Sequence, residues 1–113
     1  MPTIVLGEFE LTVLLAVLHL SDRQDPAFGS AVLAEIRSRN ARAVARGAVY
    51  VTLDRLEQKG LLAARQAGGP ASRGGRPRRV FRVTASGLVA VKAAVASIAR
   101  MQRGLEGVLG LQG

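Results

Sequence analysis

The sequence contains no cysteine, no tryptophan and only four aromatic residues, Tyr50 and three phenylalanines, among 113 residues. Without cysteine there is neither a disulfide nor a thiolate ligand for a metal ion. The single histidine, His19, has no cluster of carboxylates around it, so we expect no metal site and no cofactor. No Ser/His/Asp arrangement, carboxylate pair or phosphate-binding glycine loop is recognisable either. These absences predict a protein that is not an enzyme.

Long hydrophobic runs are also missing. The apolar stretch near the N-terminus is short, and it is preceded by Glu8 and Glu10 rather than by basic residues. This pattern fits neither a secretory signal peptide nor a membrane-spanning helix, so we expect a cytoplasmic protein with no membrane partner. A chain of this length forms one domain, whose core must be built from Leu, Val, Ala and Ile.

Acidic residues are scarce, and their distribution is uneven. The chain has 16 Lys and Arg against 8 Asp and Glu. Residues 37–82, called the basic segment below, hold twelve of these bases and only two of the acids, Asp54 and Glu57. Such an asymmetry favours a polyanionic partner such as nucleic acid. The alternative is an ordinary solvated surface, in which the excess of arginine reflects genome composition.

The stretch from Arg46 to Leu62, at the centre of the basic segment, is predicted to form a helix that begins near Arg46. Its apolar residues Val49, Leu53 and Leu56 recur at helical spacing and predict one buried face. Gly60 is expected to end the helix, because a residue just past a helix often needs positive φ. The opposite face carries small or hydrogen-bonding side chains: Ala48, Val51, Arg55 and Gln58. A buried face, an exposed face of this kind and a sharp end are typical of a recognition helix.

The neighbouring segments predict a winged helix-turn-helix, a mainly α fold with a small antiparallel β-wing. Helices are expected over residues 6–20 and from Gly29 or Ser30 to about Asn40, with Ser30 as a plausible N-cap. The second of these, a short connector and the helix that begins near Arg46 form the helix-turn-helix pattern, in which the later helix enters the DNA major groove. Strands are predicted at 61–66 and 79–84, around a tip rich in glycine and arginine. A linker between two domains is the alternative for this region.

Two helices are more apolar than one small core requires. The 6–20 helix is apolar nearly all round, and a helix capped by Thr84 is expected to run from Ala85 to about Leu109. The second of these is longer than the domain needs, which favours dimerisation; lying on its own subunit is the alternative. We therefore divide the chain into a DNA-binding domain (1–84) and a dimerisation helix (85–113). The predicted interface comprises Leu11, Leu14, Leu15, Leu18, Leu88, Val91, Val95, Ile98 and Leu105.

Two motifs resemble the PadR family of bacterial transcriptional regulators. The first is a glycine before the second helix followed by Gly-x-x-Tyr-x-x-Leu-x-Arg-Leu-Glu-x-x-Gly-Leu, matched by Gly29, Gly47, Tyr50, Leu53, Arg55, Leu56, Glu57, Gly60 and Leu61. The second lies at the exit of the wing, with the pattern basic-basic-x-aromatic-Arg-x-Thr-x-x-Gly, and is matched by Arg78, Arg79, Phe81, Arg82, Thr84 and Gly87. The chain departs from the family pattern at Ser30, Ala45 and Val51. The resemblance implies a homodimer that binds palindromic operator DNA, commonly as a repressor released by a small effector.

Expected DNA contacts fall on the recognition helix and the wing. Val51 is placed against a thymine methyl, Thr52 beside it as a hydrogen-bonding group, and Arg55 against guanine or phosphate. Tyr50 reaches DNA by resemblance, and a packed aromatic is its alternative. The remaining predicted contacts are Arg46, Ala48, Lys59, Arg73, Arg76, Arg78 and Arg79.

The segment from Arg73 to Pro77 is close to the core of an AT-hook, which enters a narrow minor groove; simple phosphate contact is the alternative. The rival to DNA binding as a whole is a winged-helix module whose basic segment binds an acidic protein.

Overall fold

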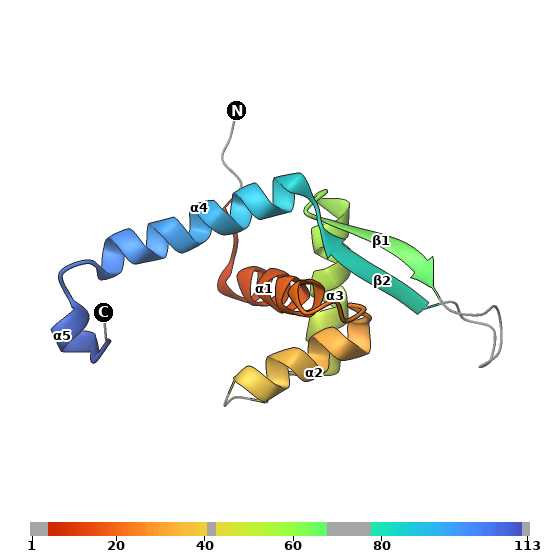
Figure 1. The fold of residues 1–113 in the computed structure, drawn as a ribbon, viewed down its shortest axis with the longest axis horizontal. Coiled ribbons are helices and arrows are strands. Elements are labelled where there is room, and N and C mark those ends of the chain that lie inside the picture. Colours follow the sequence, from red (N-terminus) through yellow and green to blue (C-terminus); the bar gives the residue numbers. More distant parts are fainter. Residues whose placement is uncertain (1–4, 41–42, 68–77, 112–113) are drawn as a thin grey trace.

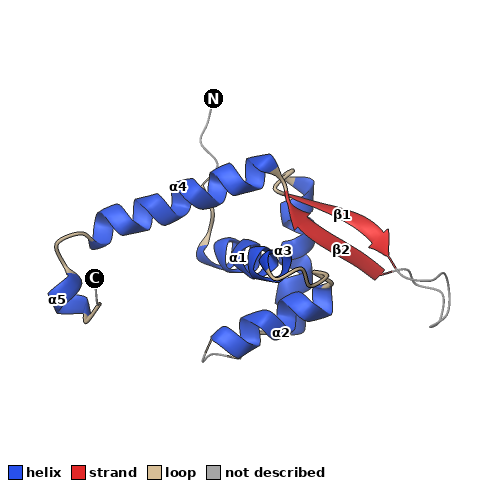
Figure 2. Cartoon of the chain, viewed as in Figure 1, coloured by secondary structure: helices blue, strands red, loops and turns tan. Residues whose placement is uncertain are grey.

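Five helices and a two-stranded sheet make up the described part of the chain. The computed structural model describes residues 5–40, 43–67 and 78–111. Figures 1 and 2 show α1, α2 and α3 packed together, with the two strands projecting to one side and α4 running past α1 to the other. In chain order the elements are α1 (Glu8–Asp22), α2 (Gly29–Arg39), α3 (Arg46–Gln58), β1 (Leu62–Ala67), β2 (Arg78–Val83), α4 (Ala85–Gln102) and α5 (Glu106–Leu109).

The core lies between the first three helices and the inner face of the sheet. Val49, Leu53 and Leu56 of α3 are fully buried, as their helical spacing predicted. Val13 and Val17 of α1 are fully buried as well. The core is completed by Val32 and Ile36 of α2, by Leu61 just before β1, by Leu62 in β1 and by Phe81 of β2. The predicted winged helix-turn-helix architecture is therefore confirmed.

The wing begins immediately after α3 and returns beside it. Gly60 adopts a φ of 77°, as predicted, and the amide of Leu61 donates to the carbonyl of Leu56 at 3.0 Å. β1 and β2 then pair antiparallel, from Leu62 opposite Val83 to Ala67 opposite Arg78. Thr84 closes the base, because its hydroxyl donates to the Gly60 carbonyl at 2.7 Å and accepts from the Gly87 amide at 3.0 Å. The predicted helix cap at Thr84 is confirmed.

Two predictions about the helix termini were wrong. Ser30 is not the N-cap of α2: the extended residue before the helix is Phe28, and Ser30 lies inside the first turn. The C-terminal helix does not continue to Leu109, because Gly104 adopts a φ of 92°. This left-handed conformation ends α4 at Gln102 and makes Leu105 the first residue before α5. Glycine favours such a conformation, so the helix breaks here rather than fraying.

A buried carboxylate joins α1 to α2. Glu35 is 6% exposed and accepts hydrogen bonds from the guanidinium groups of Arg23 and Arg39. These two bonds, that of Arg23 first, lower the pKa of Glu35 to about 2 although burial opposes the shift. Arg23 also pairs with Asp25 in the turn between the helices, at 2.7 Å. The network therefore holds the turn that leads into α2.

Replacing Gly87 with Ala is expected to destabilise the fold. A Cβ there would lie 2.2 Å from the carbonyl oxygen of Leu61, which already accepts from the amide of Thr84, and 2.8 Å from Cγ1 of Val83. We expect a loss of about 2–4 kcal/mol in the free energy of unfolding, measured by urea denaturation. Gly47→Ala is the matched control, because nothing lies within 4 Å of its Cβ position. That variant should be about 0.5–1 kcal/mol more stable than the parent. Equal effects at the two positions would contradict the close packing at Gly87.

Glu35→Gln is expected to destabilise the protein at pH 7 by about 1–3 kcal/mol, because it leaves two arginines without their carboxylate. The folded-state pKa of Glu35 lies below its ordinary value of 4.5, so the pairing stabilises the fold above that pH and is lost as the pH falls toward 2. The difference between the two proteins should therefore shrink in denaturation curves recorded from pH 5 down to pH 3. Asp22→Asn, which removes an exposed carboxylate, should change stability by less than about 0.5 kcal/mol at pH 7. A difference that persists unchanged at pH 3 would contradict the role of Glu35.

Candidate nucleic-acid interface

The outer face of α3 carries the side chains that were expected to read DNA, with one exception. Ala48, Val51 and Arg55 are exposed, Val51 by 56%. Thr52 is only 5% exposed, so its assignment as a DNA contact was wrong. Because successive residues advance by about 100° around a helix, position 52 falls only about 40° from Leu56, at the edge of the buried face.

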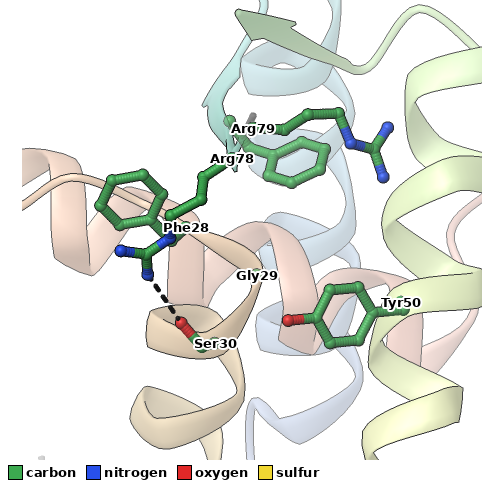
Figure 3. A pocket seen from close by; sticks show the side chains of 7 residues that line it. Phe28, Gly29, Ser30, Tyr50, Arg78 and Arg79 are labelled. Atoms are coloured by element: carbon green, nitrogen blue, oxygen red, sulfur yellow. Dashed lines mark hydrogen bonds between the residues drawn. The ribbon is translucent and has the colours of Figure 1, made fainter. Parts of the chain in front are cut away.

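Tyr50 is half-buried and packs against the first residue of α2. A Cβ on Gly29 would lie 2.5 Å from Cε1 of the Tyr50 ring, so only glycine permits this approach. In Figure 3 the Tyr50 hydroxyl points toward the start of α2. The guanidinium of Arg46 lies 5.3 Å from the centre of the Tyr50 ring. Tyr50 therefore joins α3 to α2 while its hydroxyl faces the gap between them.

A polar cavity of about 280 Å³ opens where α2, α3 and β2 meet. Arg78 stacks on Phe28, with its guanidinium carbon 3.8 Å from the ring centre, and donates to the Ser30 hydroxyl at 3.3 Å (Figure 3). The cavity is lined by Phe28, Gly29, Ser30, Tyr50, Arg78, Arg79 and Phe81. The cavity thus brings together hydroxyls, two guanidinium groups and the positive end of the α2 dipole, all beside the exposed face of α3.

Two of the cations expected to meet phosphates are paired within the chain. Arg79 donates to Asp54 at 2.7 Å and to Glu57 at 2.9 Å, both on α3. Lys59 donates to the carboxylate of Glu10 at 2.6 Å. The bond from Lys59 lowers the pKa of Glu10, whose carboxylate also accepts from the amide of Gly7 at 3.0 Å. Arg73 and Arg76, the other two cations expected from the wing, lie outside the described residues, as does the AT-hook-like tip.

Three further arginines were not among the expected DNA contacts. Arg65 and Arg82 are exposed on the outer face of the wing, where the register places them on the same side as Arg78. The period-two alternation of the strands was the signal that could have placed them. Arg37 donates to the carbonyl of Val44 at 3.0 and 3.3 Å, and so holds the segment that leads into α3.

A second surface, on α4 and α1, is apolar. Leu88, Val95, Ile98 and Leu105 are 39–48% exposed, and Leu11, Leu15 and Leu18 are half-buried. Leu14 is fully buried and Val91 is 5% exposed within the single chain, so placing these two at a subunit interface was wrong. Their surface is already covered by the core. Between α1 and α4 lies a cavity of about 460 Å³, lined mainly by apolar groups that include Leu6, Leu11, Ala94 and Ile98.

No group of three or more His, Asp or Glu side chains able to hold a metal ion occurs among residues 5–40, 43–67 and 78–111. Within the same ranges, no helix is long and apolar enough to cross a membrane.

Comparison with solved structures finds the same fold in several bacterial regulators. A PadR family transcription regulator from Clostridium difficile R20291 aligns over 91% of this chain and 99% of its own, with a TM-score of 0.70 and 16% identity. A PadR family regulator from Eggerthella lenta DSM 2243 aligns over 89% and 87%, with a TM-score of 0.63 and 27% identity. The PcaV regulator of Streptomyces coelicolor, solved with its natural ligand, aligns over 90% and 62%, with a TM-score of 0.65 and 20% identity.

Comparison of sequences gives one match. No curated protein matches the chain. Residues 17–93, which run from the C-terminal part of α1 to the first half of α4, match the model of the transcriptional regulator PadR-like family. This range contains the exposed face of α3, the cavity beside it and both described strands of the wing. The chain therefore belongs to the PadR-like family of transcriptional regulators.

Proposed function

We propose that the protein is a repressor that binds a palindromic operator as a homodimer. The observation that carries the proposal is the cationic cavity beside the exposed face of α3, because it joins a group of phosphate-binding side chains to a helix that fits the major groove. Without this cavity, the small exposed face of α3 would equally suit a module that binds another protein. With it, the surface favours DNA, a polyanion with regularly spaced charges.

Base reading is assigned to the outer face of α3. Val51 meets a thymine methyl group, Ala48 allows the helix to approach the bases closely, and Arg55 donates to guanine or to a phosphate. Few of these side chains can make two hydrogen bonds to one base. Discrimination between operator sequences is therefore expected to be modest, and much of the affinity is assigned to phosphate contacts.

A phosphate is proposed to sit in the cavity between α2, α3 and β2. Arg78, held against Phe28, supplies the positive charge, and the hydroxyl of Tyr50 and the first amides of α2 supply further donors. Arg46 is exposed at the start of α3 and is placed on a neighbouring phosphate. Contacts to both sides of α3 would fix how the helix lies in the groove.

Dimerisation is assigned to the apolar surface of α4 and α1. Its exposed leucine, valine and isoleucine side chains lie in a row. Their burial against a second copy would stabilise the dimer by about 25 cal/mol per Å² of apolar area buried. Two-fold symmetry would place the recognition helices roughly 34–36 Å apart and make the operator a palindrome. A dimer seated on such a site blocks access to the DNA, which is the simplest mode of repression.

An effector, if the protein responds to one, is assigned to the cavity between α1 and α4. The PcaV regulator, which has a related fold, was solved with its natural ligand. Here the cavity is lined mainly by aliphatic and small side chains, and neither Phe9 nor Phe28 is among its lining residues. An aliphatic ligand therefore fits this cavity better than one bound by aromatic stacking. Its position against α4 would let it alter the spacing of two subunits.

Binding to a random-sequence duplex should weaken steeply as salt is added. With Arg46, Arg55 and Arg78 each neutralising one phosphate per subunit, we expect log Kd to rise with log salt concentration with a slope of about 5, since each contact contributes about 0.9. Arg78→Ala should lower the slope by roughly 2 in a dimer and weaken binding to all duplexes alike. Fluorescence anisotropy between 50 and 300 mM salt measures both. Lys92→Ala, which removes an exposed cation on α4, is the matched control and should leave the slope unchanged. Binding to DNA that does not depend on salt would favour the protein-interaction module.

Ile98→Glu should convert the dimer into monomers. Ile98 is 48% exposed on α4, and a carboxylate buried in an apolar interface costs several kcal/mol. Val89→Glu is the control, because Val89 is 68% exposed and, nine residues earlier, points to the opposite side of the same helix. Sedimentation equilibrium should give a monomer for the first variant and a dimer for the second. A monomeric parent protein would overturn the dimer.

A further inference from the structure

Arg79 connects the wing to the recognition helix by two ion pairs. One terminal nitrogen of its guanidinium lies 2.7 Å from Oδ1 of Asp54 and the other lies 2.9 Å from Oε1 of Glu57. The group also lies 4.9 Å from the centre of the Phe81 ring. The arginine comes from β2, and both carboxylates come from α3, one turn apart. We call these three residues the clasp.

The clasp uses both acids of the basic segment. The side chain of Asp54 is 55% exposed and lies on the outer side of α3, with Tyr50 and Val51 one turn before it and Gln58 one turn after it. An unpaired carboxylate at this place would repel the phosphates of an approaching duplex. The side chain of Arg79 reaches over from the wing and neutralises part of this charge. Its two terminal nitrogens are already committed, so it is poorly placed to bind a phosphate as well.

The clasp adds to the contacts that hold the sheet against the helices. A two-stranded ribbon is marginally stable by itself, and this one is tied at its base by Thr84 and through the buried ring of Phe81. At its other end Ala67 pairs with Arg78, and Gln66 pairs with Arg79. Because neighbouring residues of a strand point to opposite faces, Arg78 contacts the start of α2 while Arg79 contacts α3. The start of β2 is thus held between two helices.

We propose that Arg79 is a positioning residue, which sets the wing at a fixed distance from α3 and screens Asp54 and Glu57 from DNA. This proposal rests on the proposed function, and it replaces the expectation that Arg79 binds a phosphate. A fixed spacing would make the helix and the wing engage one duplex together. Loss of the clasp would leave phosphate binding in place but blur the preference for one sequence, because the two elements would no longer be held in register.

The free protein provides the first test. Amide hydrogen exchange in β1 and β2 should accelerate roughly 2- to 10-fold in Arg79→Met, as expected for the loss of two partly exposed ion pairs. The double variant Asp54→Asn/Glu57→Gln should show the same acceleration, and the triple variant should show no more. Arg82→Met is the matched control, since Arg82 is an exposed arginine on the other face of the same strand. Its exchange rates should match those of the parent. Unchanged exchange in either clasp variant would overturn the proposal.

DNA binding provides the second test, with a duplex selected from a random pool by the parent protein and a random-sequence duplex as probes. Arg79→Met and the double variant should both lower the ratio of the affinity for the selected duplex to that for the random duplex roughly 3- to 10-fold. The salt dependence of DNA binding by Arg79→Met should equal that of the parent. The proposal is overturned if Arg79→Met weakens both duplexes equally and reduces the salt slope by about 0.9 per subunit, as a phosphate contact would. If the parent protein binds neither duplex, the proposed function fails, whereas the exchange measurements still decide whether the clasp holds the wing.

Discussion

Burial of one face of α3 is the constraint on which the rest of the structure depends. Val49, Leu53 and Leu56 are fully buried against α1 and α2, and burying each such side chain contributes about 1.5–3 kcal/mol. A helix fixed in this way can present only its opposite face to solvent. The turn at Gly60 then carries the chain straight into the wing, and Thr84 closes the wing's base on the same turn. Recognition helix and wing are therefore parts of one packed unit.

Charge within that unit is divided between internal pairing and exposure. The basic segment suggests a uniform cationic surface, but Arg79 and Lys59 are paired with carboxylates and Arg37 holds a backbone carbonyl. Arg46 and Arg55 remain exposed on α3, and Arg78 is held against Phe28 beside the cavity. Net charge therefore predicts the kind of partner, whereas the side chains available to it depend on which acids the fold brings near each cation.

Most of the fold could be predicted from local patterns, because helical and strand periodicity and the turn at Gly60 are properties of neighbouring residues. The errors have physical causes. Thr52, Leu14 and Val91 were placed outside because buried faces are wider than a single stripe, and the break at Gly104 depends on one backbone conformation. The pairs of Arg79 and Lys59 join residues 22 to 49 positions apart, so no local pattern reveals them. The contacts expected at Arg73 and Arg76 remain predictions.

The central claim is that a pair of recognition helices reads one symmetric DNA site. Selection of bound sequences from a random duplex pool by the full chain, followed by sequencing, tests it most directly. The account predicts enrichment of a palindrome whose half-sites are about one helical turn, roughly 10 base pairs, apart, with only a few strongly preferred positions in each half. A pool that shows no enrichment, or an enriched site without two-fold symmetry, would contradict it.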